Sequence, residues 1–299
     1  KTKSRHPDKP LPEELVKKLH DIFNKGLYQQ TVEHCNLLLE THPNSIFLTN
    51  LAGAASAKVG LFNQSMVYYN KILQVDPNFT AAHNNKGSNF RAQGDLQSAI
   101  ESYKEAIKLN PSYAEAHSNM GVVLGELGKY QAALESFSKA IKLDPAYANA
   151  FNNKGIVLEK LGDTKGALKA FSKAIKLNPK HSEAHLHQGN AYTHLGDNRQ
   201  ALKHYASATR LNPRLAAAHL AICKANKIEA DDPRIGTMMV LLEDLTLSNQ
   251  DRVHLNFGLA EVHEGLENYN LAFDFYKAGN RLRKEESKYT VATDKTLFS

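Results

Sequence analysis

Asparagine is the residue type whose spacing most suggests a binding surface. Asn85, Asn119 and Asn153 stand 34 residues apart, each 26 residues before a proline of the same period. An asparagine side chain offers both a hydrogen-bond donor and an acceptor, so a row of them can bind the backbone of an extended peptide with little regard to its side chains. Each bond contributes about 0.5–1.5 kcal/mol net, so several are needed. The spacing predicts a peptide-binding row; the alternative is that these amides bridge neighbouring helices or are solvated.

Other polar residues fall on the same expected helical faces. The complete set of predicted peptide-binding residues is Asn84, Asn85, Ser88, Arg91, Ser118, Asn119, Asn149, Asn152, Asn153, His187 and Asn190. The charged residues that flank this face are mixed in sign: Lys58, Arg91, Lys160, Lys224 and Lys227 against Glu115, Glu126, Glu159 and Glu183. We therefore expect the ligand to be a mostly neutral, extended peptide or an unstructured protein segment.

The histidines do not predict a metal site. Five of the 14 crowd one stretch, from His181 to His204. His187 and His194 share a helical face, but a separation of about 10 Å along a helix is too wide for one Zn²⁺, whose nitrogen ligands lie about 2 Å away. We expect these side chains to be structural or solvated and no metal to bind.

No arrangement of residues predicts catalysis. A nucleophile with a base, a phosphate-binding glycine loop and paired metal carboxylates are all missing from the pattern, and Gly166, Gly236 and Gly265 are isolated. Cys35 and Cys223 are too few and too distant for a disulfide framework, and they are predicted to be core thiols in a reducing compartment. We expect neither an enzyme nor a cofactor.

The elements that position the polar row repeat every 34 residues. The repeat is marked by six prolines: Pro43, Pro77, Pro111, Pro145, Pro179 and Pro213. Glycines recur 17 residues before these prolines, where they are expected to end a helix, and 24 residues before them, where they are expected to let two helices approach closely. Asp95, Asp163 and Asp197 follow the first set and are predicted N-caps.

Apolar residues within each unit follow a helical period. Alanines stand 12 and 5 residues before the prolines, and an aromatic residue stands 8 before them. Each unit is therefore predicted to contain two amphipathic helices of about 14 residues. Such a pair cannot cover its own apolar face, so neighbouring pairs must stack and share a core.

These prolines, glycines, alanines and aromatic residues resemble the tetratricopeptide repeat. The resemblance covers residues 12–213 as six units, the first a degenerate cap. It implies an all-α, right-handed α-solenoid of about eight helix pairs in which the first helix of each pair lines a concave binding face. The asparagines resemble the ladder in the repeats of the O-linked N-acetylglucosamine transferase. A carboxylate clamp of the co-chaperone subclass is disfavoured, because the matching places hold Ala81, Glu115, Asn149 and Glu183.

The period breaks after Pro213. Residues 214–247 are predicted to form an irregular helix pair, with a first helix from His219 to Ala230 and a second helix that begins at Asp232-Pro233. Residues 248–288 are predicted to form a repeat-like pair with an extended last helix. Residues 1–11 are expected to be a basic tail, and residues 289–299 a tail or linker.

The C-terminal part carries a second resemblance. Residues 231–235, 255–260 and 272–283 resemble the last repeats of tetratricopeptide-sulfotransferase proteins, in which a sulfotransferase domain follows. The alternative to an interaction scaffold is therefore the substrate-recruiting arm of a sulfotransferase whose catalytic domain lies beyond this chain. The Pro-Arg-Ser-Gly-Thr-like loop of such a domain does not occur in the sequence.

Charge and hydropathy limit the expected partners. Of the net charge of +6, the first nine residues supply half, so no basic face for nucleic acid is expected. The apolar runs fall short of the roughly 18 residues that a membrane span needs. We expect a protein or peptide ligand, no membrane or nucleic acid, and a cytoplasmic location, since no signal segment is seen. Self-association through the terminal helices is a further possibility.

Overall fold

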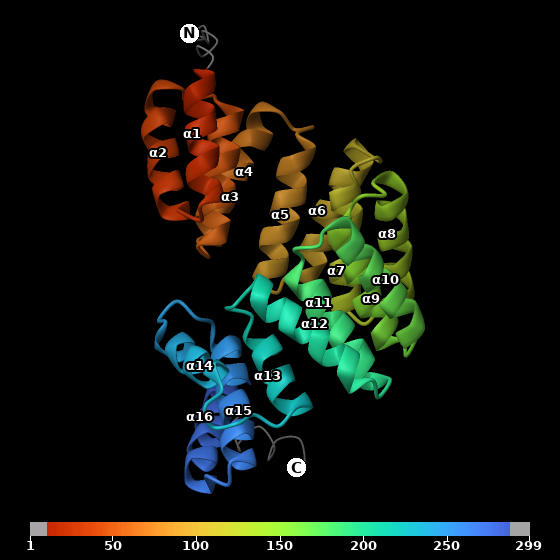
Figure 1. Cartoon of the computed structure of the whole chain (residues 1–299). Helices are drawn as coiled ribbons and strands as arrows, with labels where there is room; N and C mark the ends of the chain where they lie inside the picture. The colour runs from red at the N-terminus through yellow and green to blue at the C-terminus, as the bar shows by residue number, and fades with distance from the viewer. Residues whose placement is uncertain (1–10, 288–299) are drawn as a thin grey trace, which may run out of the picture. The chain divides into compact units, whose positions relative to one another are not determined.

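The computed structural model describes residues 11–287, and all regular secondary structure in that range is helical (Figure 1). The all-α solenoid class predicted from the repeat is confirmed, because the helices pack against their neighbours in chain order. The chain divides into two compact units, the first ending at Pro145 and the second beginning at Ala146. The predicted tail at residues 289–299 lies outside the described residues, as does the predicted basic tail apart from Leu11.

Eight helices belong to the described part of unit 1 and eight to that of unit 2. Those of unit 1 are α1 (Glu13–Asn24), α2 (Tyr28–Thr41), α3 (Ile46–Lys58), α4 (Phe62–Val75), α5 (Thr80–Ala92), α6 (Leu96–Leu109), α7 (Ala114–Glu126) and α8 (Tyr130–Leu143). Those of unit 2 are α9 (Ala148–Lys160), α10 (Thr164–Leu177), α11 (Ser182–His194), α12 (Asn198–Leu211), α13 (Ala216–Ala225), α14 (Pro233–Glu243), α15 (Asn249–Gly265) and α16 (Tyr269–Ser287).

The glycines between the two helices of a pair have the predicted left-handed conformation. Gly94 is typical, with φ at 82°, and the matching glycines of the other five units lie between 71° and 82°. The following aspartates act as N-caps: Asp95 accepts a hydrogen bond from the Ser98 N–H, and Asp163 and Asp197 cap their helices in the same way. The tight turn between paired helices therefore follows directly from local sequence.

The second set of glycines allows a close helix approach, as predicted. A Cβ atom placed at Gly155 of α9 would lie 2.5 Å from Cε1 of Phe171 on α10. In the five regular pairs the aromatic residue at this site is at most 2% exposed: Tyr69, Tyr103, Phe137, Phe171 and Tyr205. In each of these helix pairs, the aromatic ring of the second helix thus packs directly on the glycine of the first.

Histidines hold the start of four first helices. His83, His117, His185 and His219 each approach a carbonyl oxygen of the proline six residues earlier with Nε2, at 2.8–3.4 Å. Each of these histidines therefore ties the first turn of its helix to the turn that precedes it.

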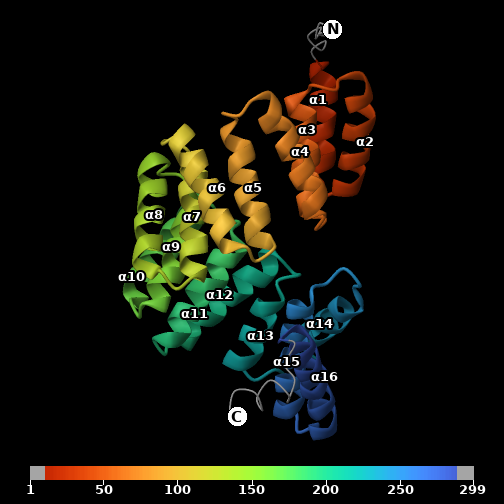
Figure 2. The ribbon, with the colours of Figure 1, turned by 180° about the vertical axis from the view of Figure 1, so that it is seen from behind.

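The seventh pair is irregular, but its first helix differs from the prediction. α13 runs from Ala216 to Ala225 and does not continue to Ala230, because Asn226 is extended and Ile228 turns into the core with 3% exposure. Asp232 caps α14 and Pro233 begins it, as predicted. α13 packs mainly on α15, and α15 also packs on α16; Figures 1 and 2 show these helices together.

The last pair begins and packs as the sequence indicates. Ser248 caps α15 by accepting a hydrogen bond from the Asp251 N–H. Gly279, inside α16, lies against Phe257 of α15, where a Cβ atom would come within 2.6 Å of the ring. None of the helices within residues 11–287 is both long enough and apolar enough to cross a membrane.

Candidate functional site

The asparagines of unit 1 join neighbouring first helices. Nδ2 of Asn85 on α5 donates to Oδ1 of Asn50 on α3 at 3.3 Å, and Nδ2 of Asn119 on α7 donates to Oδ1 of Asn84 on α5 at 3.0 Å. Each bond joins residues 35 apart in the sequence. The amides therefore form at least part of the inter-helix bridge that the sequence left open as the alternative.

Burial separates the predicted residues of unit 1 into two groups. Asn84 is 0% exposed and donates to Glu115 Oε1 at 3.2 Å, and Ser118 is 1% exposed. A ligand cannot reach these two side chains in the folded chain. Asn85 and Asn119 are half-buried, and the Oδ1 atom of Asn119 accepts no hydrogen bond from the described residues.

The other two predicted residues of unit 1 also have partners within the chain. The Ser88 hydroxyl donates to the carbonyl oxygen of Asn84 at 3.3 Å and lies 3.1 Å from the hydroxyl of Tyr103. Arg91 donates to Glu126 Oε1 through Nε at 2.9 Å and Nη2 at 2.6 Å. The charge of Arg91 is thus compensated from the next first helix.

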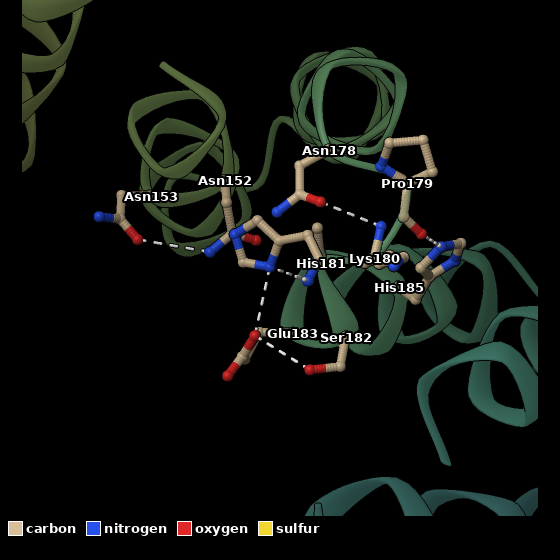
Figure 3. A network of polar contacts seen from close by, with 10 residues as sticks. Asn152, Asn153, Asn178, Pro179, Lys180, His181, Ser182, Glu183 and His185 are labelled. Atoms are coloured by element: carbon tan, nitrogen blue, oxygen red, sulfur yellow. Dashed lines mark hydrogen bonds and ion pairs between the residues drawn. The ribbon is translucent and has the colours of Figure 1, made fainter. Parts of the chain in front are cut away.

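The start of α11 carries a compact polar network (Figure 3). The backbone N–H of Ala184 lies 3.3 Å from Nδ1 of His181, and Oε2 of Glu183 lies 3.2 Å from the same nitrogen. This nitrogen accepts from Ala184 when it is unprotonated and donates to Glu183 when it carries a proton. The contact with His181 lowers the pKa of Glu183 to about 2. On α9, Asn152 is buried and donates to Asn153 Oδ1 at 3.4 Å.

A groove of about 780 Å³ lies within unit 2 on the side of the first helices. α9, α11 and α13 supply most of its wall, and α12 adds two residues. The lining residues are Ile156, Glu159, Lys160, His187, Asn190, Thr193, His194, Asn198, Tyr205, Ala217, Leu220, Ala221, Lys224 and Ala225. Its volume is that of a small-ligand or side-chain pocket.

One wall of the groove presents a fixed hydrogen-bond donor. Oδ1 of Asn190 accepts a bond from the hydroxyl of Tyr205 at 2.9 Å, and that hydroxyl lies 2.8 Å from Oγ1 of Thr193. Tyr205 is itself buried, and burial raises its pKa. The two N–H groups of the Asn190 amide have no acceptor among the described residues, so they remain available to a carbonyl oxygen.

A second wall is aromatic and uncharged. His187 stacks on Phe171 with ring centroids 5.6 Å apart and planes 21° apart. Burial lowers the pKa of His187 to about 4, so the ring is neutral at pH 7. The floor of the groove is formed by α13, where the small side chains of Ala217 and Ala221 leave space beside Leu220.

Charged groups gather toward the ends of α9, α11 and α13. Nδ1 of His194 lies 3.5 Å from Oε1 of Glu159, whose pKa is raised by burial. Lys160 and Lys224 line the same groove and are exposed.

The structure brings two predicted residues into this groove and places the others elsewhere. His187 and Asn190 line it; Asn149 is exposed on the first turn of α9, and Asn153 is half-buried on the same helix. From α13 the sequence reasoning named only Lys224, as a flanking charge, and missed the apolar residues Ala217, Leu220 and Ala221, because the period breaks after Pro213. Thr193 and Tyr205 were also missed as groove residues, although Tyr205 was recognised as the aromatic residue that recurs 8 residues before five of the six repeat prolines.

The remaining candidate groups are structural. His185 and His204 approach with Nδ1 atoms 3.3 Å apart, and within residues 11–287 no three histidine, cysteine or acidic side chains gather in a way that could hold a metal. Burial raises the pKa of Cys35 to about 12 and that of Cys223 to about 11, so both thiols stay protonated at neutral pH.

Comparison with known families identifies the repeats. The family described as "TPR repeat" matches residues 87–128 and 125–162, and families described as "Tetratricopeptide repeat" match residues 148–181 and 170–203. These matches cover residues 87–203, and within that range they agree with the tetratricopeptide repeat that the resemblance implied. No curated protein matches it. The relation to tetratricopeptide-sulfotransferase proteins stays a prediction.

Solved structures share the solenoid fold. A chain of the APC/C hetero-tetramer Cut9-Hcn1 matches 87% of this chain, which spans 48% of that one, with 20% identity and a TM-score of 0.63. The pilF protein of Pseudomonas aeruginosa matches 68% of this chain and 93% of its own, with 21% identity and a TM-score of 0.56. MamA matches 55% of this chain and 96% of its own, with 29% identity and a TM-score of 0.46. Only the first two likenesses support the fold, and they support the fold alone.

Proposed function

We propose that this chain is a protein-interaction module and that the groove of unit 2 binds an extended, mostly neutral peptide segment. The observation that carries the proposal is the combination of an apolar floor on α13 with a fixed, unoccupied amide donor at Asn190. The floor would take an apolar side chain, and the amide would bind a backbone carbonyl. An extended segment offers both groups in alternation.

Asn190 is prepared for this role by its neighbours. The Tyr205 hydroxyl fixes the amide through Oδ1, which leaves both Nδ2 hydrogens directed away from that bond. A pre-positioned donor loses little side-chain entropy when a ligand binds. The neutral His187 ring adds a flat apolar surface beside it.

Asn85 and Asn119 in unit 1 form a second proposed contact surface. Both amides are half-buried, and each is held by one bond to a neighbouring first helix. The buried side chains of Asn84, Ser118 and Asn152 are left out of the proposed ligand surface. Their part is to position the exposed members of the row.

The test is capture of peptides from a displayed library of short random sequences. We expect Asn190→Ala to weaken binding of the selected peptides about tenfold, since one well-placed hydrogen bond to the ligand is lost. Asn270→Ala, an exposed asparagine on α16, is the matched control and should bind as the unaltered chain does. Thermal unfolding must show that Asn190→Ala stays folded. We expect that it does, because the Tyr205 hydroxyl keeps Thr193 as a partner. Equal binding by the two variants would contradict the proposal.

A further inference from the structure

The groove contains one carboxylate whose charge is poorly compensated by the described residues. Glu159, in the last turn of α9, has a side chain that is only 15% exposed. Its Oε1 atom is shielded from solvent and accepts no hydrogen bond, and its ion-pair partner is His194, with Nδ1 at 3.5 Å. A ligand therefore reaches the carboxylate only through the part of the side chain that stays exposed. Burying a carboxylate without hydrogen-bond donors is costly. The position of Glu159 on the groove wall suggests where a donor could come from.

The corresponding positions two repeats earlier hold a carboxylate that has hydrogen-bond donors. Arg91 and Glu126 occupy the places that correspond to Glu159 and His194, with the signs of the charges exchanged. There the guanidinium contributes two N–H donors, at 2.6 and 2.9 Å. Glu159 has instead one contact, to a side chain that is 62% exposed and charged only when protonated. The carboxylate of Glu126 is therefore paired by Arg91, whereas the carboxylate of Glu159 could still accept bonds from a further cation.

We infer that Glu159 recognises a lysine or arginine side chain of the peptide bound in the groove. This inference rests on the proposed function and names the ligand chemistry at one end of the site. An ammonium or guanidinium group beside Glu159 would supply the charge-assisted donors that the chain does not. The low exposure of the carboxylate makes such a pair stronger than one at the surface.

Two lysines restrict the kind of basic segment that fits. Lys160 and Lys224 line the same groove and are exposed, so they repel further cations and attract acidic groups. The expected ligand therefore carries one basic residue with neutral or acidic neighbours. A run of several lysines or arginines should not be preferred.

Protonation of Glu159 provides an independent readout. Burial raises its pKa, and the positive charges of His194 on α11 and Lys160 on α9 oppose that rise. Lys224 on α13 lines the same groove, and Tyr205 on α12 is close enough to respond to the carboxylate. Affinity for a peptide with a basic residue should fall as the pH is lowered through the range in which Glu159 takes up a proton.

The first experiment compares library selections on three full-length proteins. The unaltered chain and the control Glu243→Gln, an exposed carboxylate on α14, should both enrich peptides with a single lysine or arginine. Glu159→Gln should select peptides without that enrichment. Because the glutamine keeps the shape and removes a poorly paired charge, we expect its thermal unfolding midpoint not to fall.

The second experiment titrates the most enriched peptide and its analogue with glutamine at the basic position. Glu159→Gln should weaken binding of the basic peptide by about tenfold and leave the analogue unaffected, as expected for one charge-assisted hydrogen bond. Peptide capture by the unaltered chain without basic enrichment, or equal weakening of both peptides, would overturn the inference and leave the proposed function standing. No capture at all would overturn both.

Discussion

Three histidines of unit 2 have lowered pKa values, and one of them, His187, lines the groove. Burial lowers the pKa values of His185, His187 and His204, most clearly that of His187, to about 4. His187 consequently offers an aromatic face to a ligand at neutral pH, consistent with a mostly neutral peptide. The polar contribution comes from Asn190, one turn further along α11.

The depressed pKa of His187 predicts a stability change in mild acid. The unfolded chain binds a proton near pH 6.5, whereas the folded chain resists it down to about pH 4. The contribution of the neutral His187 ring to the free energy of unfolding is therefore complete above about pH 6.5, and it is lost as the pH falls from there toward 4. We expect unfolding of His187→Gln in urea to show a smaller loss of stability between pH 7 and pH 5, by roughly 2 kcal/mol. An unchanged pH dependence would show that the ring is not buried in the folded chain.

The contact between Gly155 and Phe171 gives a second test at the level of single residues. A methyl group at Gly155 would lie 2.5 Å from the ring, so Gly155→Ala should destabilise the chain by about 1–3 kcal/mol through overpacking. Gly236 in α14 has no atom within 4 Å of the place of a Cβ, so Gly236→Ala should stabilise by up to about 1 kcal/mol. Denaturant midpoints of the two variants should move in opposite directions.

Among the helices, the end of α14 depends on a distant side chain. Arg252 on α15 donates to the carbonyl oxygen of Leu242 through Nη1 at 2.8 Å and to that of Asp244 through Nη2 at 2.6 Å. Arg214 also pairs with the carboxylate of Asp244. These bonds hold the irregular seventh pair, which lacks the proline and glycine signals of the regular repeats.

Arg252→Met should expose this dependence, because the variant keeps most of the apolar stem and removes the donors. We expect a loss of about 1–3 kcal/mol, since two carbonyl oxygens at a helix end lose their partner. Arg281→Met on α16, where the arginine is 74% exposed, should change stability by less than about 0.5 kcal/mol. Chemical denaturation measures the stability of both variants. Equal stability would contradict the role of Arg252 in holding the end of α14.

The helices that the sequence predicts best are those with local signals. Glycine at positive φ, aspartate N-caps and the ring on the second glycine are all encoded within one unit, so the five regular pairs could be placed. The early end of α13 depends on the burial of Ile228 against other helices, which no local pattern specifies. The bonds between residues 35 apart were predicted only as an alternative, because the register between repeats decides which amides pair.

At the scale of the whole chain, the division into two units was not predictable. The 34-residue period passes through Pro145 without a change, yet the compact units separate there. The candidate site was predicted only in part for a related reason. Periodicity identified the face that carries His187 and Asn190, but burial decides which asparagines remain accessible, and burial depends on packing between repeats.

Self-association through the terminal helices stays a prediction. α16 exposes Tyr269 and Phe273, at 65% and 66%, so an apolar surface is present on that helix. Light scattering over a range of protein concentrations would test this prediction. A monomer mass at every concentration would exclude self-association.

The central claim is that the groove of unit 2 holds the peptide, and mapping of backbone NMR shifts tests it most directly. A library-selected peptide would be added to the isotope-labelled full-length chain. The account predicts that the largest shift changes fall on α9, α11 and α13, around Asn190, His187 and Ala221. Shift changes confined to the second helices α10 and α14, with these three residues unaffected, would contradict the proposed site.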